Sequence, residues 1–176
     1  MKQEIIISGF GVLSMGKILA YAALMEGKEV TWMPAYGPEQ RGGTANVTVI
    51  ISEEPISSPI LSSYDSAILL NQPSLDKFQP KVKPGGTLIY DSFGIIEKPV
   101  RTDIESWQIP AMEAAAEMAM MKCFNMFVLG GYLKLHPIVS IESVMKALRK
   151  TLPERHHGLL PMNEQAILKG MEIIHQ

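Results

Sequence analysis

The stretch "EIIISGFGVLSMGK", residues 4–17, carries the pattern most informative about the fold class. Residues 4–8 form a short apolar run that stops at Gly9, which is typical of a strand buried on both faces of a parallel sheet. Gly9 and Gly11 predict a turn, and apolar positions at helical spacing follow over residues 12–25. Strand, glycine turn and helix in this order predict the start of a β-α-β unit.

The rest of the chain predicts five more strands and several helices. Pro80 and Pro84 mark residues 71–86 as a short helix or loop. Helical spacing is strongest at 140–152, which begins with the N-cap signal Ser140, and at 162–174. An alanine- and methionine-rich helical segment, 111–135, precedes them. The further strands are expected at 29–36, 46–52, 66–70, 86–92 and 107–111. We therefore predict one α/β domain over residues 1–176, with a helical C-terminal layer.

Composition limits the classes of function. The 176 residues are 47% hydrophobic and 19% charged, with a net charge of −2, so the chain lacks the basic excess that holds nucleic acid. Cys123 is its one cysteine, which excludes an iron–sulfur cluster held by this chain alone and favours a reducing cytoplasm. No apolar run approaches the roughly 20 residues of a membrane span. The twelve methionines are compatible with contact with a partner subunit, but filling of the domain's own core by the Met-rich helices around 112–126 is the competing interpretation and the favoured one.

The glycine turn is a candidate cofactor-binding feature, through Gly9 and Gly11. Glycines after a strand let the backbone approach a ligand, and a helix N-terminus favours an anion. The spacing of Gly9, Gly11 and Gly16 departs from the dinucleotide fingerprint, and no acidic residue ends the second strand. A tight turn that packs the first helix on the sheet is the competing interpretation, and the sequence favours it.

Other side chains that could carry chemistry are dispersed. The adjacent histidines 156 and 157 lie in a proline-bounded segment that predicts a solvated loop. Cys123, inside an apolar helical run, predicts a buried and inert thiol. Asp65, Asp91 and Asp103 lie near strand ends without a partner that would make an acid–base pair. We therefore expect no catalytic residue and no metal site in this chain.

The stretch "YGPEQRGGTANVTV", residues 36–49, is the most unusual in composition. Arg41 beside Gly42 and Gly43 suits contact with a carboxylate or phosphate, because the guanidinium binds such groups in bidentate fashion and glycine lets the backbone come close. An internal pair between Glu39 and Arg41 that shapes a loop explains the same residues. The residue types leave both interpretations open.

The Tyr-Gly-Pro-Glu-x-Arg-Gly-Gly motif at 36–43 resembles the gamma subunit of 2-oxoacid:ferredoxin oxidoreductases. The resemblance extends over nearly the whole chain, through "SGFG", "EGKEVTWMPAYGPE", "ANVTVIIS", "KPGGTLIYDS", "IPAMEAAAEM", "FNMFVLGGYL" and "NEQAILKGMEI". One departure concerns the first turn, since the family usually has Gly-Phe-Gly-Gly-Gln-Gly where this chain has only Gly-Phe-Gly before residue 12. That difference puts a ligand role of the turn in question.

The resemblance implies a Rossmann-like, three-layer domain with a mostly parallel sheet. It also implies a complex that converts a 2-oxoacid and CoA to acyl-CoA and CO2 and reduces ferredoxin. Thiamine diphosphate, Mg and iron–sulfur clusters are then expected on alpha, beta and ferredoxin-like delta subunits, with CoA as co-substrate. This chain would be non-catalytic and would shape the complex and the CoA channel. The partner- or CoA-facing residues that it implies are Tyr36, Gly37, Pro38, Glu39, Arg41, Gly42, Gly43 and Asn125.

Two other hypotheses compete with this one. A stand-alone nucleotide-binding or regulatory Rossmann-like domain would bind NAD or ATP by itself, and the irregular glycine spacing argues against it. A stand-alone enzyme would need a nucleophile or an acid–base pair, which the sequence does not present. The resemblance leaves open which 2-oxoacid is used, because the specificity of such a complex is expected around thiamine diphosphate on other chains.

Overall fold

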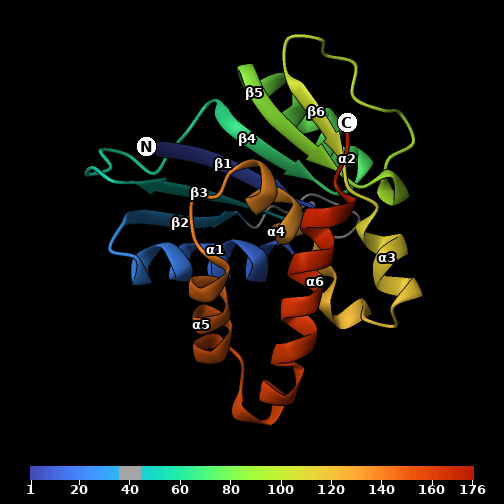
Figure 1. Cartoon of the computed structure of the whole chain (residues 1–176). Helices are drawn as coiled ribbons and strands as arrows, with labels where there is room; N and C mark the ends of the chain where they lie inside the picture. Colours follow the sequence, from blue (N-terminus) through green and yellow to red (C-terminus); the bar gives the residue numbers. More distant parts are fainter. Residues whose placement is uncertain (36–44) are drawn as a thin grey trace.

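The computed structural model describes residues 1–35 and 45–176, which contain a six-stranded sheet with helices on both faces (Figure 1). The strand order is β2-β3-β1-β4-β5-β6. The strands are β1 (Lys2–Ser8), β2 (Glu29–Ala35), β3 (Asn46–Ser52), β4 (Tyr64–Leu69), β5 (Val82–Tyr90) and β6 (Glu105–Gln108). The predicted α/β class is thus confirmed, and all six predicted strands are present, with shifted ends at five of them.

Five strands run in one direction and β3 runs against them. β1, β4, β5 and β6 pair in parallel, whereas β3 is antiparallel to both of its neighbours, β1 and β2. Val49 in the middle of β3 faces Ile5 on one side and Trp32 on the other. The predicted β-α-β unit is therefore present, but its two strands are separated by β3, which turns back after β2 as an antiparallel neighbour.

Six α-helices lie in the described part of the chain: α1 (Val12–Met25), α2 (Gln72–Phe78), α3 (Ala111–Glu117), α4 (Phe124–Leu135), α5 (Ile141–Thr151) and α6 (Leu160–Ile173). Two of the helices begin at an N-cap residue whose side chain accepts a backbone hydrogen bond. Ser140 caps α5 by accepting a hydrogen bond from the Ser143 N–H at 3.0 Å, and Asn71 caps α2 in the same way through the Ser74 N–H. The proline-bounded segment 153–161, predicted as a solvated loop, instead forms 3-10 turns over Glu154–Leu159 and the start of α6.

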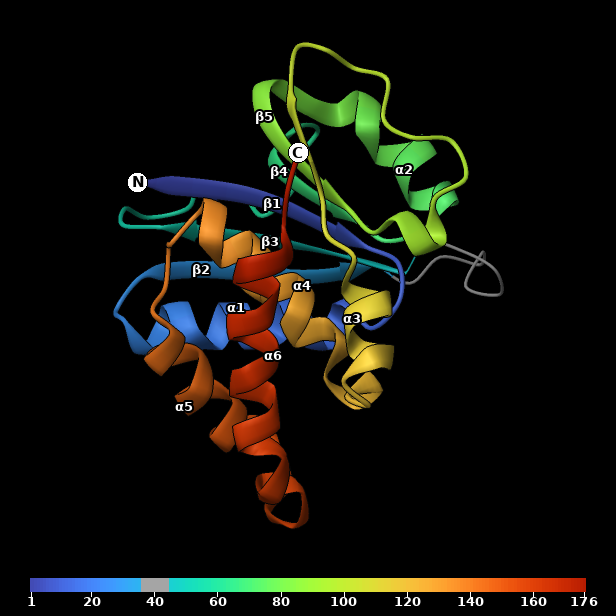
Figure 2. The same ribbon diagram turned by 45° about the vertical axis from the view of Figure 1, so that its right-hand side comes forward.

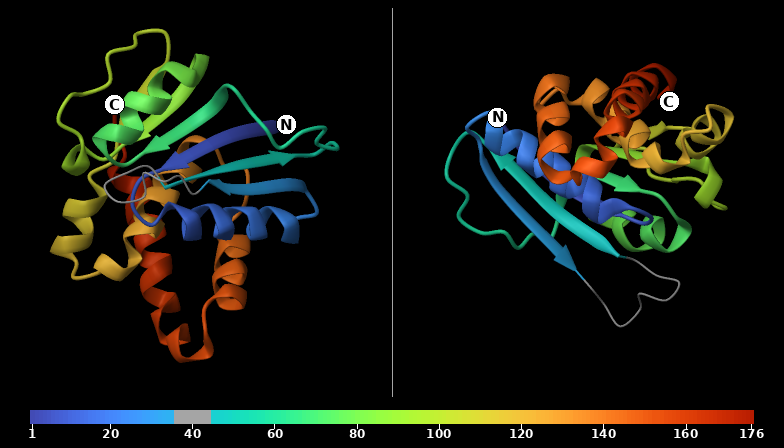
Figure 3. Two further views of the ribbon diagram at one scale, coloured as in Figure 1. Left: turned by 180° about the vertical axis from the view of Figure 1, so that it is seen from behind. Right: turned by 90° about the horizontal axis from the view of Figure 1, so that it is seen from below.

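The sheet divides the interior into two cores of unequal size. On one face, α1 and the helices α3 to α6 pack over side chains such as Ile5, Ile7 and Val49. On the other face, α2 alone covers a smaller group that includes Ile6, Leu88 and Phe78. Figures 2 and 3 show this asymmetry, with α2 on the opposite side of the sheet from α1, α5 and α6. The C-terminal helices therefore form one layer together with α1.

The C-terminal segment closes one border of the sheet. After α6, the backbones of His175 and Gln108 exchange two hydrogen bonds, of 2.6 and 2.9 Å, at the end of the edge strand β6. α6 itself crosses α4 at Gly130 and Gly170, where the two backbones meet without intervening side chains. The end of the chain thus joins the helical layer to the sheet border.

Candidate functional site

The carboxyl ends of the parallel strands form the candidate site, because the chain leaves β1 and β4 toward opposite faces of the sheet. β1 continues into α1 on one face and β4 into α2 on the other. A doubly wound sheet opens a crevice at such a point, and ligands of these folds bind there. The predicted glycine turn, Gly9 to Gly11, lies at this edge.

Both turn glycines occupy backbone conformations that favour glycine. Gly9 has φ 129° and Gly11 has φ 66°. Close packing adds a second constraint, since a Cβ on Gly9 would lie 2.7 Å from Leu70 Cβ, and one on Gly16 would lie 2.7 Å from Val47 Cγ1. These contacts explain why glycine is needed at both positions: Gly16 lets α1 pack closely on β3, and Gly9 lies against the residue that follows β4. Cofactor binding at Gly9 and Gly11 stays a prediction.

Asn125 of α4 lies over the same turn, so two sequence features expected on separate grounds meet in space. Its amide nitrogen donates to Ser14 Oγ at 2.9 Å, and Ser14 Oγ donates to the Gly11 carbonyl at 3.1 Å. A Cβ on Gly11 would overlap the Asn125 side-chain amide. Gly11 is the N-cap of α1 and provides no side-chain hydrogen bond to the helix. Asn125 of α4 thus bonds to the first turn of α1 through Ser14, whose hydroxyl bonds back to Gly11.

The predicted loop residues Tyr36, Gly37, Pro38, Glu39, Arg41, Gly42 and Gly43 lie outside the described residues. The two residues that border them are placed at this edge. Ala35 pairs with Asn46 at the ends of β2 and β3, and the Ala45 carbonyl accepts a hydrogen bond of 3.1 Å from Gly9 N. The chain therefore enters and leaves the 36–44 segment beside the glycine turn.

Sequence reasoning missed a hollow of about 380 Å³ at the same edge, beyond the end of β5. At its base, the buried Asp91 carboxylate accepts the N–H groups of Phe93 and Met112, at 3.0 and 2.8 Å. Burial raises the pKa of Asp91 above its usual value, while these N–H groups act in the opposite direction. Pro110 and the exposed Phe93 complete the apolar wall. No signal in the sequence pointed to this hollow, because its walls come from two separate parts of the chain, the residues after β5 and the start of α3.

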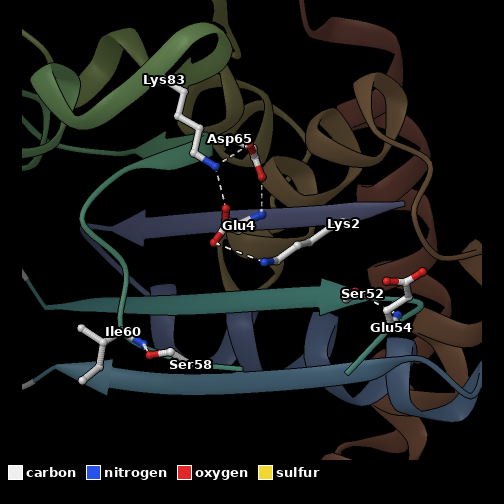
Figure 4. A network of polar contacts seen from close by, with 8 residues as sticks. All are labelled: Lys2, Glu4, Ser52, Glu54, Ser58, Ile60, Asp65 and Lys83. Carbon is white, nitrogen blue, oxygen red and sulfur yellow. Dashed lines mark hydrogen bonds and ion pairs between the residues drawn. The ribbon is translucent and has the colours of Figure 1, made fainter. Parts of the chain in front are cut away.

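At the opposite ends of the strands, ion pairs link β1, β4 and β5 (Figure 4). Lys83 Nζ on β5 lies 2.6 Å from Glu4 Oε1 of β1 and 3.0 Å from Asp65 Oδ1 of β4, and Asp65 also accepts the Glu4 N–H at 2.9 Å. Hydrogen bonding to Glu4 and then to Asp65 raises the pKa of Lys83, against the effect of burial. Asp65 therefore has a structural partner that the sequence did not indicate.

The residues present do not fit the metal and cluster cofactors of the resembled family. Within residues 1–35 and 45–176, no three His, Cys, Asp or Glu side chains gather closely enough to hold a metal ion. The sole cysteine, Cys123, is buried, and burial raises the pKa of its thiol. A [4Fe–4S] cluster takes four thiolates, which this chain cannot supply. His157 Nε2 donates a hydrogen bond to the Leu152 carbonyl, 2.9 Å away.

In the same described ranges, no helix has both the length and the apolar character needed to cross a bilayer.

The sheet order and the helices on both faces define a doubly wound α/β domain. A model of the family described as pyruvate ferredoxin/flavodoxin oxidoreductase matches residues 7–173, and the chain belongs to this family. It is 38% identical, over 170 residues, to the ketoisovalerate oxidoreductase subunit VorA of Methanothermobacter thermautotrophicus. That match covers 94% of this chain and 35% of VorA, so the chain spans about a third of this relative.

Two solved structures share the fold over 98% of this chain. A keto/oxoacid ferredoxin oxidoreductase gamma subunit from Geobacter sulfurreducens, 28% identical, has a TM-score of 0.83 and is covered over 96% of its length. The 2-oxoglutarate:ferredoxin oxidoreductase of Magnetococcus marinus, solved with 2-oxoglutarate, coenzyme A and succinyl-CoA bound, has a TM-score of 0.86 at 25% identity, and 31% of that chain is covered. The same domain thus occurs both as a separate subunit and as part of a longer chain.

Proposed function

We propose that this chain is the gamma-type subunit of a 2-oxoacid:ferredoxin oxidoreductase. The complex would convert a 2-oxoacid and CoA to acyl-CoA and CO2 and pass the electrons to ferredoxin. The observation that carries the proposal is the full-length match in fold to a separate gamma subunit. The iron–sulfur clusters are assigned to alpha, beta and delta partners, because this chain offers one buried thiol. Thiamine diphosphate and Mg are assigned to the same partners on the resemblance to the family.

Within that complex, the role proposed for this chain is positional. The glycine turn with Asn125, together with the predicted 36–43 loop, is assigned to the CoA channel or to a partner surface. Support comes from the clustering of Gly11, Asn125 and both ends of the loop at one edge of the sheet. Binding of coenzyme A by the Magnetococcus marinus relative is consistent with this assignment. The cytoplasm is the proposed compartment.

Co-purification from the native cell tests the assembly. We expect the chain to be recovered with polypeptides that contain thiamine diphosphate and iron–sulfur clusters, and the preparation to reduce ferredoxin in the presence of CoA and a 2-oxoacid. Assays with pyruvate, 2-oxoglutarate, 2-oxoisovalerate and indolepyruvate then identify the substrate. A lone chain that binds NAD or ATP would instead support the stand-alone nucleotide-binding hypothesis and overturn this one.

The channel assignment has its own test in the assembled complex. Arg41→Ala and Asn125→Ala are expected to raise the apparent KM for CoA while the KM for the 2-oxoacid stays unchanged, or else to weaken assembly. Arg149→Ala provides a matched control, because Arg149 is exposed in the last turn of α5. If both variants keep the KM for CoA and the assembly of the parent, this edge does not face CoA or a partner.

A further inference from the structure

Strand β2 leaves one border of the sheet open. It is the outermost strand on that side, and within residues 1–35 and 45–176 it pairs only with β3 (Figure 3). At the other border, the backbones of His175 and Gln108 pair at the end of β6. The unpaired backbone groups of an edge strand form a row of hydrogen-bond donors and acceptors that another extended strand can complete. The open border therefore fits a strand as its partner.

Pro34 identifies which backbone groups of β2 point outward. Proline has no N–H, so the N–H side of this position in an edge strand faces away from the neighbouring strand. Because this direction alternates along a strand, the backbone groups of Val30 and Trp32 point the same way as those of Pro34. Thr31, between them, faces β3 and pairs there with Ile50. Val30 and Trp32 thus offer their N–H and C=O groups to a further strand.

This short edge is complementary to a second copy of itself. In an antiparallel pair centred on Thr31, Val30 lies opposite the second copy's Trp32, and Trp32 lies opposite the second copy's Val30. Both of these pairs are of the hydrogen-bonded kind, in which the two residues exchange both N–H···O bonds. The ladder ends where Lys28, whose N–H already bonds within its own chain, lies opposite Pro34. One register therefore uses every outward N–H of the open edge.

The side chains beside the open border are apolar where two copies would meet. A groove of about 290 Å³ is lined there by Val30 and Trp32 of β2 and by Lys17, Tyr21 and Leu24 of α1. The three helical residues share one face of α1, because they are spaced by four and three positions. Trp32 is 38% exposed and Leu24 is 54% exposed. These side chains line one hollow, so they form a single surface beside the unpaired backbone.

Charge favours a second copy as the occupant of this surface. Residues 26–28 join α1 directly to β2, so the helix and the strand run in opposite directions. A two-fold axis at Thr31 then places the N-terminal half of one α1 beside the C-terminal end of the other. The N-terminal half contains Lys17, which makes no ion pair within the described residues, and the helix ends at Glu26. Glu26 pairs with Lys28 at 3.1 Å but lies at the negative end of its own helix dipole, where a second positive group is favourable.

We propose that two copies of this chain associate through β2, antiparallel about Thr31, and so join their sheets into one. A contact of this kind uses the same surface on both copies and closes at two. Within the described residues, Thr31 Oγ1 has no hydrogen-bond partner, and the residue directly opposite in this register is the second copy's Thr31. Threonine pairs across antiparallel strands are stabilising. The proposal concerns this chain alone and goes beyond the function proposed above.

A cysteine at the two-fold axis tests the register. The Cα atoms of a directly opposite, non-hydrogen-bonded pair are about 4.5 Å apart, which a disulfide can span. Thr31→Cys in the full-length chain should therefore form a covalent dimer under a mild oxidant, seen on a non-reducing gel. Met33→Cys is the matched control, because it lies on the same face of β2 but would be about 13 Å from its copy along the strands. Cys123 is buried and common to both variants.

Sedimentation velocity over a range of protein concentrations measures the association itself. Trp32→Glu places a charge in the apolar contact and should weaken dimerisation at least about tenfold, as the loss of a buried aromatic anchor does. Lys17→Glu should make dimerisation stronger at high salt, because it turns attraction to Glu26 into a repulsion that salt screens. Val100→Glu is the matched control, since Val100 is 80% exposed on the loop between β5 and β6. This control should dimerise as the parent does.

Each outcome supports or overturns the proposal. A parent that stays monomeric at every concentration, with equal cross-linking of Thr31→Cys and Met33→Cys, overturns it. Cross-linking of Thr31→Cys to a different polypeptide in the assembled complex also overturns it, because the edge then pairs with another subunit. If circular dichroism shows that Trp32→Glu does not fold, the two cysteine variants still decide. Ferredoxin reduction by the complex tests the proposed function separately and has no bearing on these results.

Discussion

Gly170 of α6 lies directly against the backbone of Phe127 in α4, so closely that a Cβ on Gly170 would overlap the Phe127 carbonyl oxygen. The contact is reciprocal, since a Cβ on Gly130 of α4 would overlap the carbonyl of Ile167 in α6. The two helices therefore touch through their backbones, and this close spacing is possible because Gly130 and Gly170 have no Cβ.

Replacing Gly170 by alanine is expected to force α4 and α6 apart. Overpacking of a tight core contact costs about 1–3 kcal/mol, and backbone atoms cannot give way as a flexible side chain can. We expect a clearly lower Tm in thermal unfolding followed by circular dichroism. Gly158→Ala is the control, since a Cβ there meets nothing within 4 Å. A Gly170→Ala protein as stable as this control would contradict the close crossing.

A double-mutant cycle tests the contact between Gly11 and Asn125. Gly11→Ala introduces both strain at φ 66° and overlap with the Asn125 amide, and should lower the free energy of unfolding by about 1–3 kcal/mol. Asn125→Ala removes the overlap but leaves the backbone strain. Denaturant unfolding should therefore show that the double variant loses less than the sum of the single losses. Strict additivity would mean that the two side chains do not meet.

Lys83→Met tests the charged edge of the sheet. Lys83 is more than a third exposed, so solvent screening limits its ion pairs, and we expect a loss of only about 1 kcal/mol at neutral pH. The pKa of Lys83 is raised above its usual 10.5, so its contribution is fully present below that pH and is lost as pH rises through the folded-state pKa. The difference in unfolding free energy between parent and variant should shrink in strong alkali. Lys146→Met, on an exposed i,i+4 pair of α5, is the control.

His136 should produce a pH dependence of stability. Burial lowers its pKa below the usual 6.5, while Glu105 and Asp65 oppose the shift. The unfolded chain then binds the proton more readily, so stability is full above pH 6.5 and falls as pH drops toward the folded-state pKa. NMR titration of the His136 ring should place its pKa below 6.5. His136→Gln can retain a hydrogen bond to Thr87 and should flatten this part of the profile; an unchanged slope would exclude His136 as its source.

The elements themselves followed from short-range patterns in the sequence. Helix α1 has the predicted bounds, residues 12–25, because a glycine turn precedes it and its apolar residues repeat with a period of 3.6. Strand β3 has the predicted bounds, residues 46–52, because turn residues flank it. The position of β3 between β1 and β2 did not follow, since strand order depends on pairing between distant segments. The fold class was predictable and the order of the sheet was not.

The candidate site was predicted in part. The sequence drew attention to Gly9, Gly11 and Asn125, and the structure brings Gly11 and Asn125 into contact across more than 100 residues of chain. The partner of Asp65 and the hollow beside Asp91 could not be predicted, because each depends on side chains from separate strands or helices. The residues of the 36–43 loop stay a prediction, since they lie outside the described residues.

The smaller core under α2 has a dynamic consequence. Local unfolding draws on the least stable cooperative unit, and the unit with fewer buried apolar side chains opens at a lower free energy. Gln72 and Gln79 tie the backbone of residues 92–104, the loop that connects β5 to β6, to this unit and not to the larger helical layer. How long this loop keeps its shape is therefore governed by the stability of α2, and a substitution such as Leu75→Ala, in the core under α2, would shorten the lifetime of the ordered loop.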